Sequence, residues 1–566
     1  MGLPLPLSTR IRWKASLLLL ALLITPALTF PQGPGSESQG KVPAIKVHTQ
    51  LVLIPAEVTD SKGNRVTDMK KEDFAVFENG KRQEIALFDH ITTKAEVIKP
   101  VEVPPGAFTN TMQHGPNRIT IFVVDLLNSK MEEQKEARKQ ILEFLSTSLN
   151  EQEPVCLMSI DAKGVWLIHG FTTDPKILMD ALKELKKQPS DPDKPPKNPE
   201  EELYKTMEGW HSKDGQRVKA ALEARLSMLR TAVGFEDLSM NERIRMTLLS
   251  LLEIGNAFIG LPGRKSLIWA GAGFPFAASN AAAFAKDWKV GNADGQDLLT
   301  LYAQTWRTLE EANIAVYPLD VSELGNPAYA GPGMGEALPE HVMVDTHLGN
   351  MENFADMTGG RFCDRSMGAK KCFEQAAADS ADYYLLGIYD KNGTEKPGWR
   401  KLSVKTERAG LKIRARSGYY LSAGAQEAPT EKKLVEMALF SPFEYTGLSL
   451  NVQLTGVASG KKPETKIVHF EYTIPGSAVL VSHDDGNHLK LEFGAVARDA
   501  SGKMAASFTK VLEGKLSEAQ SRQINEKGIS FKGEMELGPG EYALSFAVLD
   551  QVNDNTGSVL APYKVE

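Results

Sequence analysis

The feature that most constrains the fold is a set of four short apolar runs that alternate with segments of helical spacing. Residues 118–125, RITIFVVD, precede the helical pattern MEEQKEARKQILEFLSTSL, and similar apolar runs occupy residues 154–161, 265–273 and 314–320. Strands that are apolar on both faces and alternate with helices are typical of a mostly parallel sheet covered by helices. We therefore expect a doubly wound α/β domain over residues 116–382.

Stretches with period-two alternation flank this domain on both sides. Residues 45–115 contain VHTQLVLIPAEVTD and an Asn-Gly pair at 79–80 between two strand-like runs, which is the strongest short signal for a hairpin. Residues 383–422 contain three further strand-like runs. Each segment is too small to bury a core alone. We expect residues 45–92 to pair with residues 383–422, so that the α/β domain is an insertion in a β-sandwich.

The remaining residues of the chain indicate a separate β domain. Residues 440–566 consist of strand-like runs separated by turn residues, which is typical of an immunoglobulin-like β-sandwich. Residues 423–439 read as a linker, and residues 186–202 as a Pro-rich insertion in the α/β domain. The predicted fold class is multidomain α/β plus all-β. A doubly wound, Rossmann-type sheet would be inserted between β segments and followed by the C-terminal sandwich.

The N-terminus has the pattern of a secretory signal peptide. Positive residues up to Lys14 precede the apolar run ASLLLLALLI, and small residues around Ala27 offer a cleavage site. The run is about half of the roughly 20 residues that a membrane-spanning helix needs, so an uncleaved anchor is the alternative. We expect residues 1–27 to be removed and residues 28–44 to be a flexible lead-in. The mature chain, without a transmembrane segment, would be exported to the periplasm, the cell envelope or the extracellular space.

Charge and cysteine content narrow the classes of partner and site. A formal net charge of −7, without a basic stripe or basic residues interleaved with aromatics, argues against a nucleic-acid partner. The three cysteines do not have the spacing of a zinc site. Cys363 and Cys372 flank the short polar loop DRSMGAKK, and after export we expect them to form a disulfide, with two free thiols as the alternative. Cys156 lies in the apolar run PVCLMSI and reads as a buried small side chain.

Three motifs together resemble a known family. The order strand, aspartate, helix and strand is similar to a von Willebrand factor A domain. Residues 51–90, residues 263–275 (GRKSLIWAGAGFP) and residues 379–420 resemble the VWFA-related domain family best known from Acidobacteria. The resemblance covers roughly residues 45–422. It implies an A-like α/β domain bracketed by β segments.

The resemblance also locates a candidate metal site. In A domains a metal-ion-dependent adhesion site holds Mg²⁺ through an Asp-x-Ser-x-Ser loop, because a hard cation takes several oxygen ligands. Asp125 matches the first ligand and Ser129 the last, but Leu127 replaces the middle serine and Asn128 offers its oxygen out of position. The Pro-rich insertion replaces the usual Gly-Gly-Thr turn, and WAGAG lacks the second aspartate. We expect a degenerate site, and therefore no cofactor, with weak Mg²⁺ or Ca²⁺ binding at Asp125 and Ser129 as the alternative.

The other reading of this loop is structural. Asn128 or Ser129 would cap the following helix, and Asp125 would bond the loop backbone. No catalytic residue is expected elsewhere, because the sequence contains neither a Gly-x-Ser-x-Gly elbow nor a Gly-x-Gly-x-x-Gly fingerprint. The histidines and aspartates at 341–347 and 483–488 read as loops, because each group lacks the further ligands that a metal ion needs.

The sequence therefore favours a non-enzymatic, exported module that binds a protein partner, with Asp125, Asn128 and Ser129 as the candidate ligand face. Two alternatives remain open: a structural or assembly scaffold of the cell envelope, and a hydrolase with an unrecognised site. An open groove around Asp125 would favour the module. An exposed apolar patch on the β domains would favour the scaffold. A deep pocket with histidines and carboxylates would favour the hydrolase.

Overall fold

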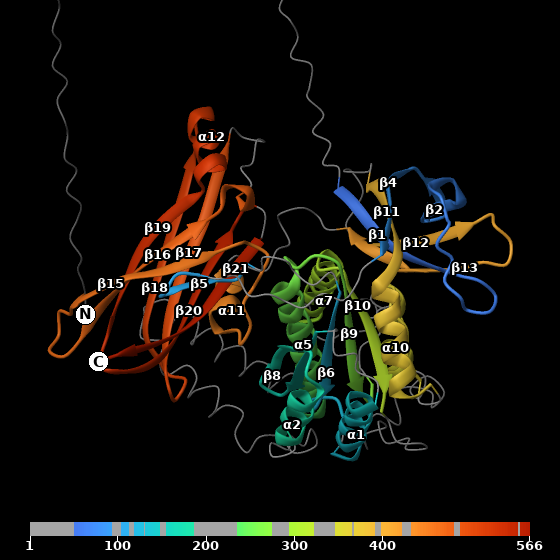
Figure 1. The fold of residues 1–566 in the computed structure, drawn as a ribbon, viewed down its shortest axis with the longest axis horizontal. Helices are drawn as coiled ribbons and strands as arrows, with labels where there is room; N and C mark the ends of the chain where they lie inside the picture. The colour runs from blue at the N-terminus through green and yellow to red at the C-terminus, as the bar shows by residue number, and fades with distance from the viewer. Residues whose placement is uncertain are drawn as a thin grey trace, which may run out of the picture. The chain divides into compact units, whose positions relative to one another are not determined.

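A computed structural model describes the chain over residues 50–92, 103–111, 118–129, 131–147, 154–185, 235–273, 294–321, 346–364, 367–390, 398–421, 432–479, 487–552 and 555–566. The predicted signal peptide, the lead-in, the Pro-rich insertion at 186–202, the loop at 341–345 and most of the turn at 483–488 lie outside these residues. The described residues all belong to one compact unit, Thr49–Glu566, and form five β-sheets with the helices that pack on them (Figure 1).

The two β segments at 45–92 and 383–422 pair with each other and form an antiparallel sandwich, here called the N-terminal sandwich. Its first sheet has the order β13-β1-β11-β4, with bounds Lys412–Ala415, Gln50–Thr59, Asp382–Asp390 and Ile85–Thr92. Its second sheet has the order β14-β12-β2-β3, with bounds Gly418–Leu421, Gly398–Thr406, Phe74–Glu78 and Lys81–Gln83, and the short helix η1 is Lys71–Asp73. Because side chains alternate along a strand, Val52 and Ile54 enter the core while Leu51 and Leu53 face outward.

The sequence between these segments contains the one described sheet with parallel strands. Its order is β10-β9-β6-β7-β8, with bounds Ile314–Asp320, Arg264–Gly271, Arg118–Asp125, Val155–Asp161 and Gly164–Thr172. The first four strands run parallel, and β8 returns antiparallel to β7 through a tight turn. Helices α5 (Phe235–Phe258), α7 (Asp294–Glu311) and α9 (Thr346–Thr358) contribute to the core on one face. Helices α1 (Met131–Thr147), α2 (Pro175–Leu185) and α10 (Gly368–Ala381) contribute to the core on the other.

The C-terminal residues form a second antiparallel sandwich. One sheet has the order β19-β16-β15-β5, with bounds Ile529–Leu537, Lys466–Ile474, Asn451–Ser459 and Ala107–Thr109. The other has the order β18-β17-β20-β21, with bounds Met504–Lys515, His488–Asp499, Gly540–Asp550 and Asn555–Val565. Helices α11 (Lys432–Phe440) and α12 (Glu518–Lys527) and the short helix η3 (Gly476–Ala478) complete this part. Residues 432–439 of the predicted linker therefore belong to a helix.

The predicted fold class is wrong. The chain is mostly β, and it is divided into five small sheets in which all strand pairings other than β10–β9, β9–β6 and β6–β7 are antiparallel among the described residues. The prediction took the fold class from the apolar runs of residues 118–320, whereas these belong to one sheet of five strands, and the other four described sheets are antiparallel. The C-terminal sandwich also differs from an immunoglobulin-like domain made of residues 440–566 alone, because it includes β5 from residues 107–109.

Candidate functional site

Asp125 ends strand β6, and both of its carboxylate oxygens accept hydrogen bonds from neighbouring groups. Oδ1 accepts from the backbone N–H of Leu127 at 2.9 Å and of Asn128 at 2.8 Å. Oδ2 accepts from Asn128 Nδ2 at 2.9 Å and from the indole Nε1 of Trp269 at 3.0 Å. The carboxylate thus bonds the loop backbone, and its oxygens face N–H donors.

The side chains predicted as a ligand face lie together but inside the protein. Asp125 is 1% exposed, Asn128 4% and Ser129 0%. Asn128 Nδ2 also donates to Thr247 Oγ1 at 2.9 Å, and Ser129 Oγ accepts from the backbone N–H of Ala272 at 3.2 Å. Burial raises the pKa of Asp125, and the hydrogen bonds from Asn128 and Trp269 oppose that rise. The Asp125 loop is therefore a buried polar network rather than an open groove.

This donor set does not fit Mg²⁺ or Ca²⁺. A hard cation needs free oxygen lone pairs, whereas four N–H groups point at the Asp125 oxygens. Among the described residues, no group of three or more His, Cys, Asp or Glu side chains is placed to hold a metal ion. Trp269, which the sequence reading did not assign to the site, lies on β9 opposite Val123 of β6.

We expect a chelator to leave the thermal unfolding of the protein unchanged. A cation at 100 times its dissociation constant would stabilise the folded state by about 2.7 kcal/mol, so its removal would lower Tm by several degrees. The measurement is calorimetry with chelator, and then after adding back Mg²⁺ or Ca²⁺ to the same sample. The claim that the Asp125 loop holds no metal ion would be contradicted if either ion raised Tm reversibly and an Asp125→Ala variant did not show this rise.

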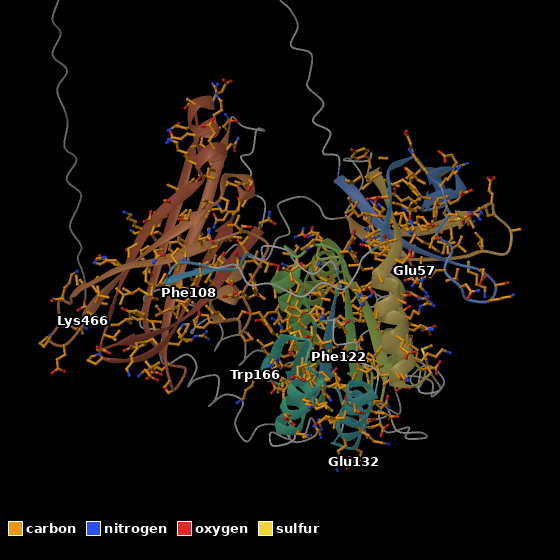
Figure 2. The ribbon with its side chains drawn as sticks, viewed as in Figure 1. Glu57, Phe108, Phe122, Glu132, Trp166 and Lys466 are labelled. Atoms are coloured by element: carbon orange, nitrogen blue, oxygen red, sulfur yellow. A yellow bond between two sulfur atoms is a disulfide. The ribbon has the colours of Figure 1, made fainter. Side chains whose placement is uncertain are left out.

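A second cluster of buried charges joins the N-terminal sandwich to the parallel sheet. We call Glu57, Arg65, Arg264, Arg361 and Asp379 the ionic cluster. Glu57, labelled in Figure 2, lies on β1, and its oxygens accept from Arg264 Nη1 at 3.1 Å and Arg361 Nη2 at 2.9 Å. Asp379 of α10 accepts from Arg361 Nε at 3.0 Å and also from Arg65. Five residues that are far apart in the sequence thus share one ion-pair network.

The two carboxylates of the ionic cluster have opposite pKa shifts. Burial and the nearby Asp379 raise the pKa of Glu57 to about 7, although Arg264, Arg65 and Arg361 act to lower it. Burial also acts to raise the pKa of Asp379, but the same arginines outweigh it and hold that pKa below its ordinary value. Because every charge in the cluster has an opposite partner, the arrangement is suited to holding elements together.

Lys265, beside Arg264 on β9, is buried among backbone carbonyls. Its Nζ donates to the carbonyl oxygens of Leu261 at 2.6 Å, Gly263 at 3.0 Å and Ala312 at 2.6 Å. Burial lowers the pKa of this amine to about 7. Its three donors are engaged by residues that follow α5 and α7, so Lys265 links the ends of these helices to β9.

The three cysteines and the tyrosines Tyr383 and Tyr384 lie in the interior. Cys363 and Cys372 form a disulfide with Cα atoms 5.6 Å apart, and Cys156 is free and buried. Tyr384 donates its hydroxyl to Val66 O at 2.9 Å. The Arg264 guanidinium lies 5.8 Å from the ring centre of Tyr383. Both tyrosines therefore pack inside the protein.

An exposed apolar patch lies on the outer face of the first sheet of the N-terminal sandwich. We call Leu51, Leu53, Leu87 and Tyr389 the outer quartet; they are 40%, 42%, 37% and 45% exposed. The register places Leu51 opposite Tyr389, and Leu53 and Leu87 on either side of Gly387. A Cβ at Gly387 would lie 2.7 Å from Leu87 Cβ and 3.1 Å from Leu51 Cδ1, so glycine lets the apolar side chains approach one another.

The comparisons with known proteins do not assign a family. No protein-family model and no curated protein matches the chain. Solved structures that match include a glycosyl hydrolase family 2 member from Bacteroides cellulosilyticus, with 10% identity and a TM-score of 0.15 over 33% of this chain and 20% of that chain. A likeness at this level carries no argument about fold or activity. In the part of the chain that the structure describes, no helix is long and apolar enough to cross a membrane.

Proposed function

We propose that the chain is an exported, non-enzymatic scaffold that binds another protein through the outer face of its N-terminal sandwich. The observation that carries the proposal is the outer quartet. Charged and polar residues usually cover the solvent face of an antiparallel sheet, whereas this face presents three leucines and a tyrosine side by side. Export is supported by the N-terminal signal pattern and by the Cys363–Cys372 disulfide, which requires an oxidising compartment.

The face that carries the outer quartet continues into a surface that another part of the same chain already covers. This supports a protein as the binding partner. The outer face of β1 and β11 continues from the quartet to Glu57 and Tyr383, and Arg264 of the parallel sheet packs there. One end of this face is therefore already buried by protein through charged and aromatic contacts, whereas the exposed end is apolar and aromatic. We propose that the partner covers it with an apolar surface and an acceptor for the Tyr389 hydroxyl.

The burial of the Asp125 loop favours a scaffold over the adhesion-type module that the sequence alone favoured. Its polar groups bond one another, and its three candidate ligand-face residues are at most 4% exposed. A partner would have to unfold the loop in order to reach them. The outer quartet, in contrast, can be covered without a change in the fold.

We expect Leu53→Asp to weaken partner binding by at least about tenfold, because it places a charge at the centre of an apolar contact. The partner would be captured from envelope extract by the full chain, with and without chelator, and its affinity for purified variants would be measured. Val511→Asp is the matched control, since Val511 is also an exposed strand residue but lies on β18. Equal affinities of Leu53→Asp and wild type for the captured protein would refute the proposal. If the full chain captured only further copies of itself, the face would be a self-association surface, and the proposal of a different protein partner would be refuted.

A further inference from the structure

The five residues that follow α9 contact more elements than their length suggests. We call residues 359–363 the junction segment. Gly359 has a φ of 75° and ends α9, as glycine commonly does at the residue after a helix. At Gly360 an added Cβ would lie 1.9 Å from Val316 O, so the segment runs directly against β10. Its backbone then bonds β10, with Cys363 N donating to Pro318 O at 2.8 Å.

The same segment reaches the N-terminal sandwich through two direct bonds and through Arg264 of the parallel sheet. Gly359 O accepts from Arg264 Nη2 at 2.6 Å, and Arg264 itself bonds Glu57 of β1. Gly360 O accepts from Arg414 Nη1 of β13. Arg361 Nη2 donates to Glu57 Oε2 at 2.9 Å. The position of the junction segment therefore determines whether these bonds to β1 and β13 can form.

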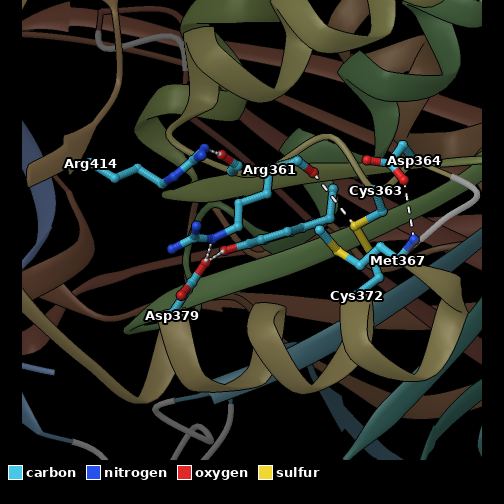
Figure 3. Close-up of a disulfide and its surroundings, with 9 residues drawn as sticks. Arg361, Cys363, Asp364, Met367, Cys372, Asp379 and Arg414 are labelled. Carbon is cyan, nitrogen blue, oxygen red and sulfur yellow. Dashed lines mark hydrogen bonds and ion pairs between the residues drawn. A yellow bond between two sulfur atoms is a disulfide. The ribbon is translucent and has the colours of Figure 1, made fainter. Parts of the chain in front are cut away.

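Two cross-links tie the junction segment to helix α10 (Figure 3). One is the ion pair between Arg361 Nε and Asp379 Oδ2 at 3.0 Å, and the other is the Cys363–Cys372 disulfide. Residues two apart in an extended chain point to the same side, and residues seven apart in a helix share a face. Arg361 and Cys363 therefore form parallel ionic and covalent links to Asp379 and Cys372.

We infer that the Cys363–Cys372 disulfide is a redox-sensitive lock on the junction between the N-terminal sandwich and the parallel sheet. With the bond intact, the junction segment is held on α10 and β10, and Arg361 is placed across Glu57 and Asp379. Both cysteines are buried, so a dithiol reaches the bond when the junction segment opens. It then transfers two electrons and two protons, giving two thiols and an oxidised dithiol. The segment is then held to α10 by the ion pair without the covalent link, and the bonds of Arg361 and Gly360 to the sandwich loosen.

The effect reaches the sandwich because the ionic cluster is a network. Glu57 and Asp379 are both buried and share Arg361, so Glu57 loses compensating charge when its bond to Arg361 loosens, and Asp379 moves with the Arg361 side chain that it still holds. Arg65 bonds Asp379 and donates to Asp382 O at 3.0 Å, so a shift of the Asp379 carboxylate moves Arg65 and the backbone that it holds. Arg65 is distant from the disulfide in sequence, which makes it a reporter for the junction rather than for the cysteine loop.

The inference is tested by limited proteolysis of the full chain with an arginine-specific protease, with and without a dithiol. Cleavage after a residue follows the population of its open state, so we expect cleavage after Arg65 to accelerate by about tenfold on reduction. Cleavage after Arg82, on the exposed strand β3 of the same sandwich, should not change. A Cys363→Ser/Cys372→Ser variant should match the reduced wild type, and the dithiol should have no further effect on it.

An Arg361→Met variant with its disulfide intact provides a second route to the same state, and we expect faster cleavage after Arg65 there too. Three outcomes would overturn the inference. The first is acceleration after Arg361 alone, which would confine the effect of the disulfide to its own loop. The second is equal acceleration after Arg65 and Arg82, which would mean general destabilisation. The third is no change at any arginine, which would mean that the disulfide does not control the junction.

Discussion

Replacing Arg264 with methionine is expected to lower the free energy of unfolding by about 3–5 kcal/mol, the cost typical of removing one partner from a buried ion pair. The Arg264 side chain is 2% exposed in its ion pair with Glu57, and it also donates to the carbonyl oxygens of Asp379 at 3.2 Å and Gly359 at 2.6 Å. Methionine occupies a similar volume but leaves these acceptors without the guanidinium. Denaturant unfolding at constant m value measures the change.

The loss of unfolding free energy in the Arg264→Met variant should also depend on pH, and its direction follows from the pKa of Glu57. Burial and Asp379 raise the pKa of Glu57 to about 7 in the folded protein, and Arg264 opposes that rise. A carboxyl with a raised folded pKa binds more protons folded than unfolded, so its stabilising contribution is present at low pH and is lost as pH rises through the folded pKa. Without Arg264 the pKa of Glu57 rises further. The variant should therefore be closer to wild type at pH 5 than at pH 8.

Arg408→Met is the matched control for Arg264→Met. Arg408 also pairs with a carboxylate, that of Asp68 at 3.1 Å, but this pair is exposed to solvent. Solvent screens such a pair, so we expect no measurable change in unfolding. Equal effects of the two substitutions, or a smaller loss for Arg264→Met at pH 8 than at pH 5, would contradict the role assigned to the ionic cluster.

Local patterns in the sequence located several elements of the fold. The apolar run RITIFVVD forms β6, which lies between two parallel neighbours, and the alternating segment after Gln50 forms β1. The pairing of β1 with β11 followed from the argument that neither β segment could bury a core alone. These inferences worked because side-chain period and the burial of apolar surface are properties of short segments.

The fold class was predicted wrongly because it depends on pairings between distant segments. Strand β5 joins β15, and Asn110, the residue after β5, donates through Nδ2 to Leu448 O, 338 positions later in the chain. Three residues of strand do not carry a periodic signal that would assign them to a C-terminal sheet. Likewise, β8 pairs antiparallel with β7 at the edge of the parallel sheet, and the residues of a single strand do not specify that direction.

The candidate site shows the same division between local and distant information. Asp125 and its bonds to the loop backbone could be read from the residues 125–129, because an aspartate after a strand commonly bonds the N–H groups that follow. The bond from Trp269 could not be read in this way, because Trp269 lies on the neighbouring strand β9. The ionic cluster was missed because its members come from three distant stretches of the chain, 57–65, 264 and 361–379. Its one local signal is a charged pair, Arg264 and Lys265, in a strand that is otherwise apolar.

Replacing Asp125 with alanine is expected to lower the free energy of unfolding by at least about 4 kcal/mol, since an orphaned buried donor costs about 1–3 kcal/mol and four donors lose their acceptor. These donors are the N–H of Leu127, the N–H and Nδ2 of Asn128 and the indole N–H of Trp269. Asp125→Asn, which keeps one oxygen, should fall between alanine and wild type. The measurement is denaturant unfolding in the presence of chelator, so that metal binding does not contribute.

Asp60 is a matched control for Asp125, because it makes nearly the same bonds in solvent. Its Oδ1 accepts from the N–H of Lys62 and of Asn64, both at 2.8 Å, and its Oδ2 accepts from Asn64 Nδ2 at 2.9 Å. Water replaces the carboxylate in an Asp60→Ala variant, so we expect little change in unfolding, whereas the donors around Asp125 are shielded from water. Equal losses for the two alanine variants would mean that burial is not what makes the Asp125 network costly to break. The loop would then be open enough to bind a ligand.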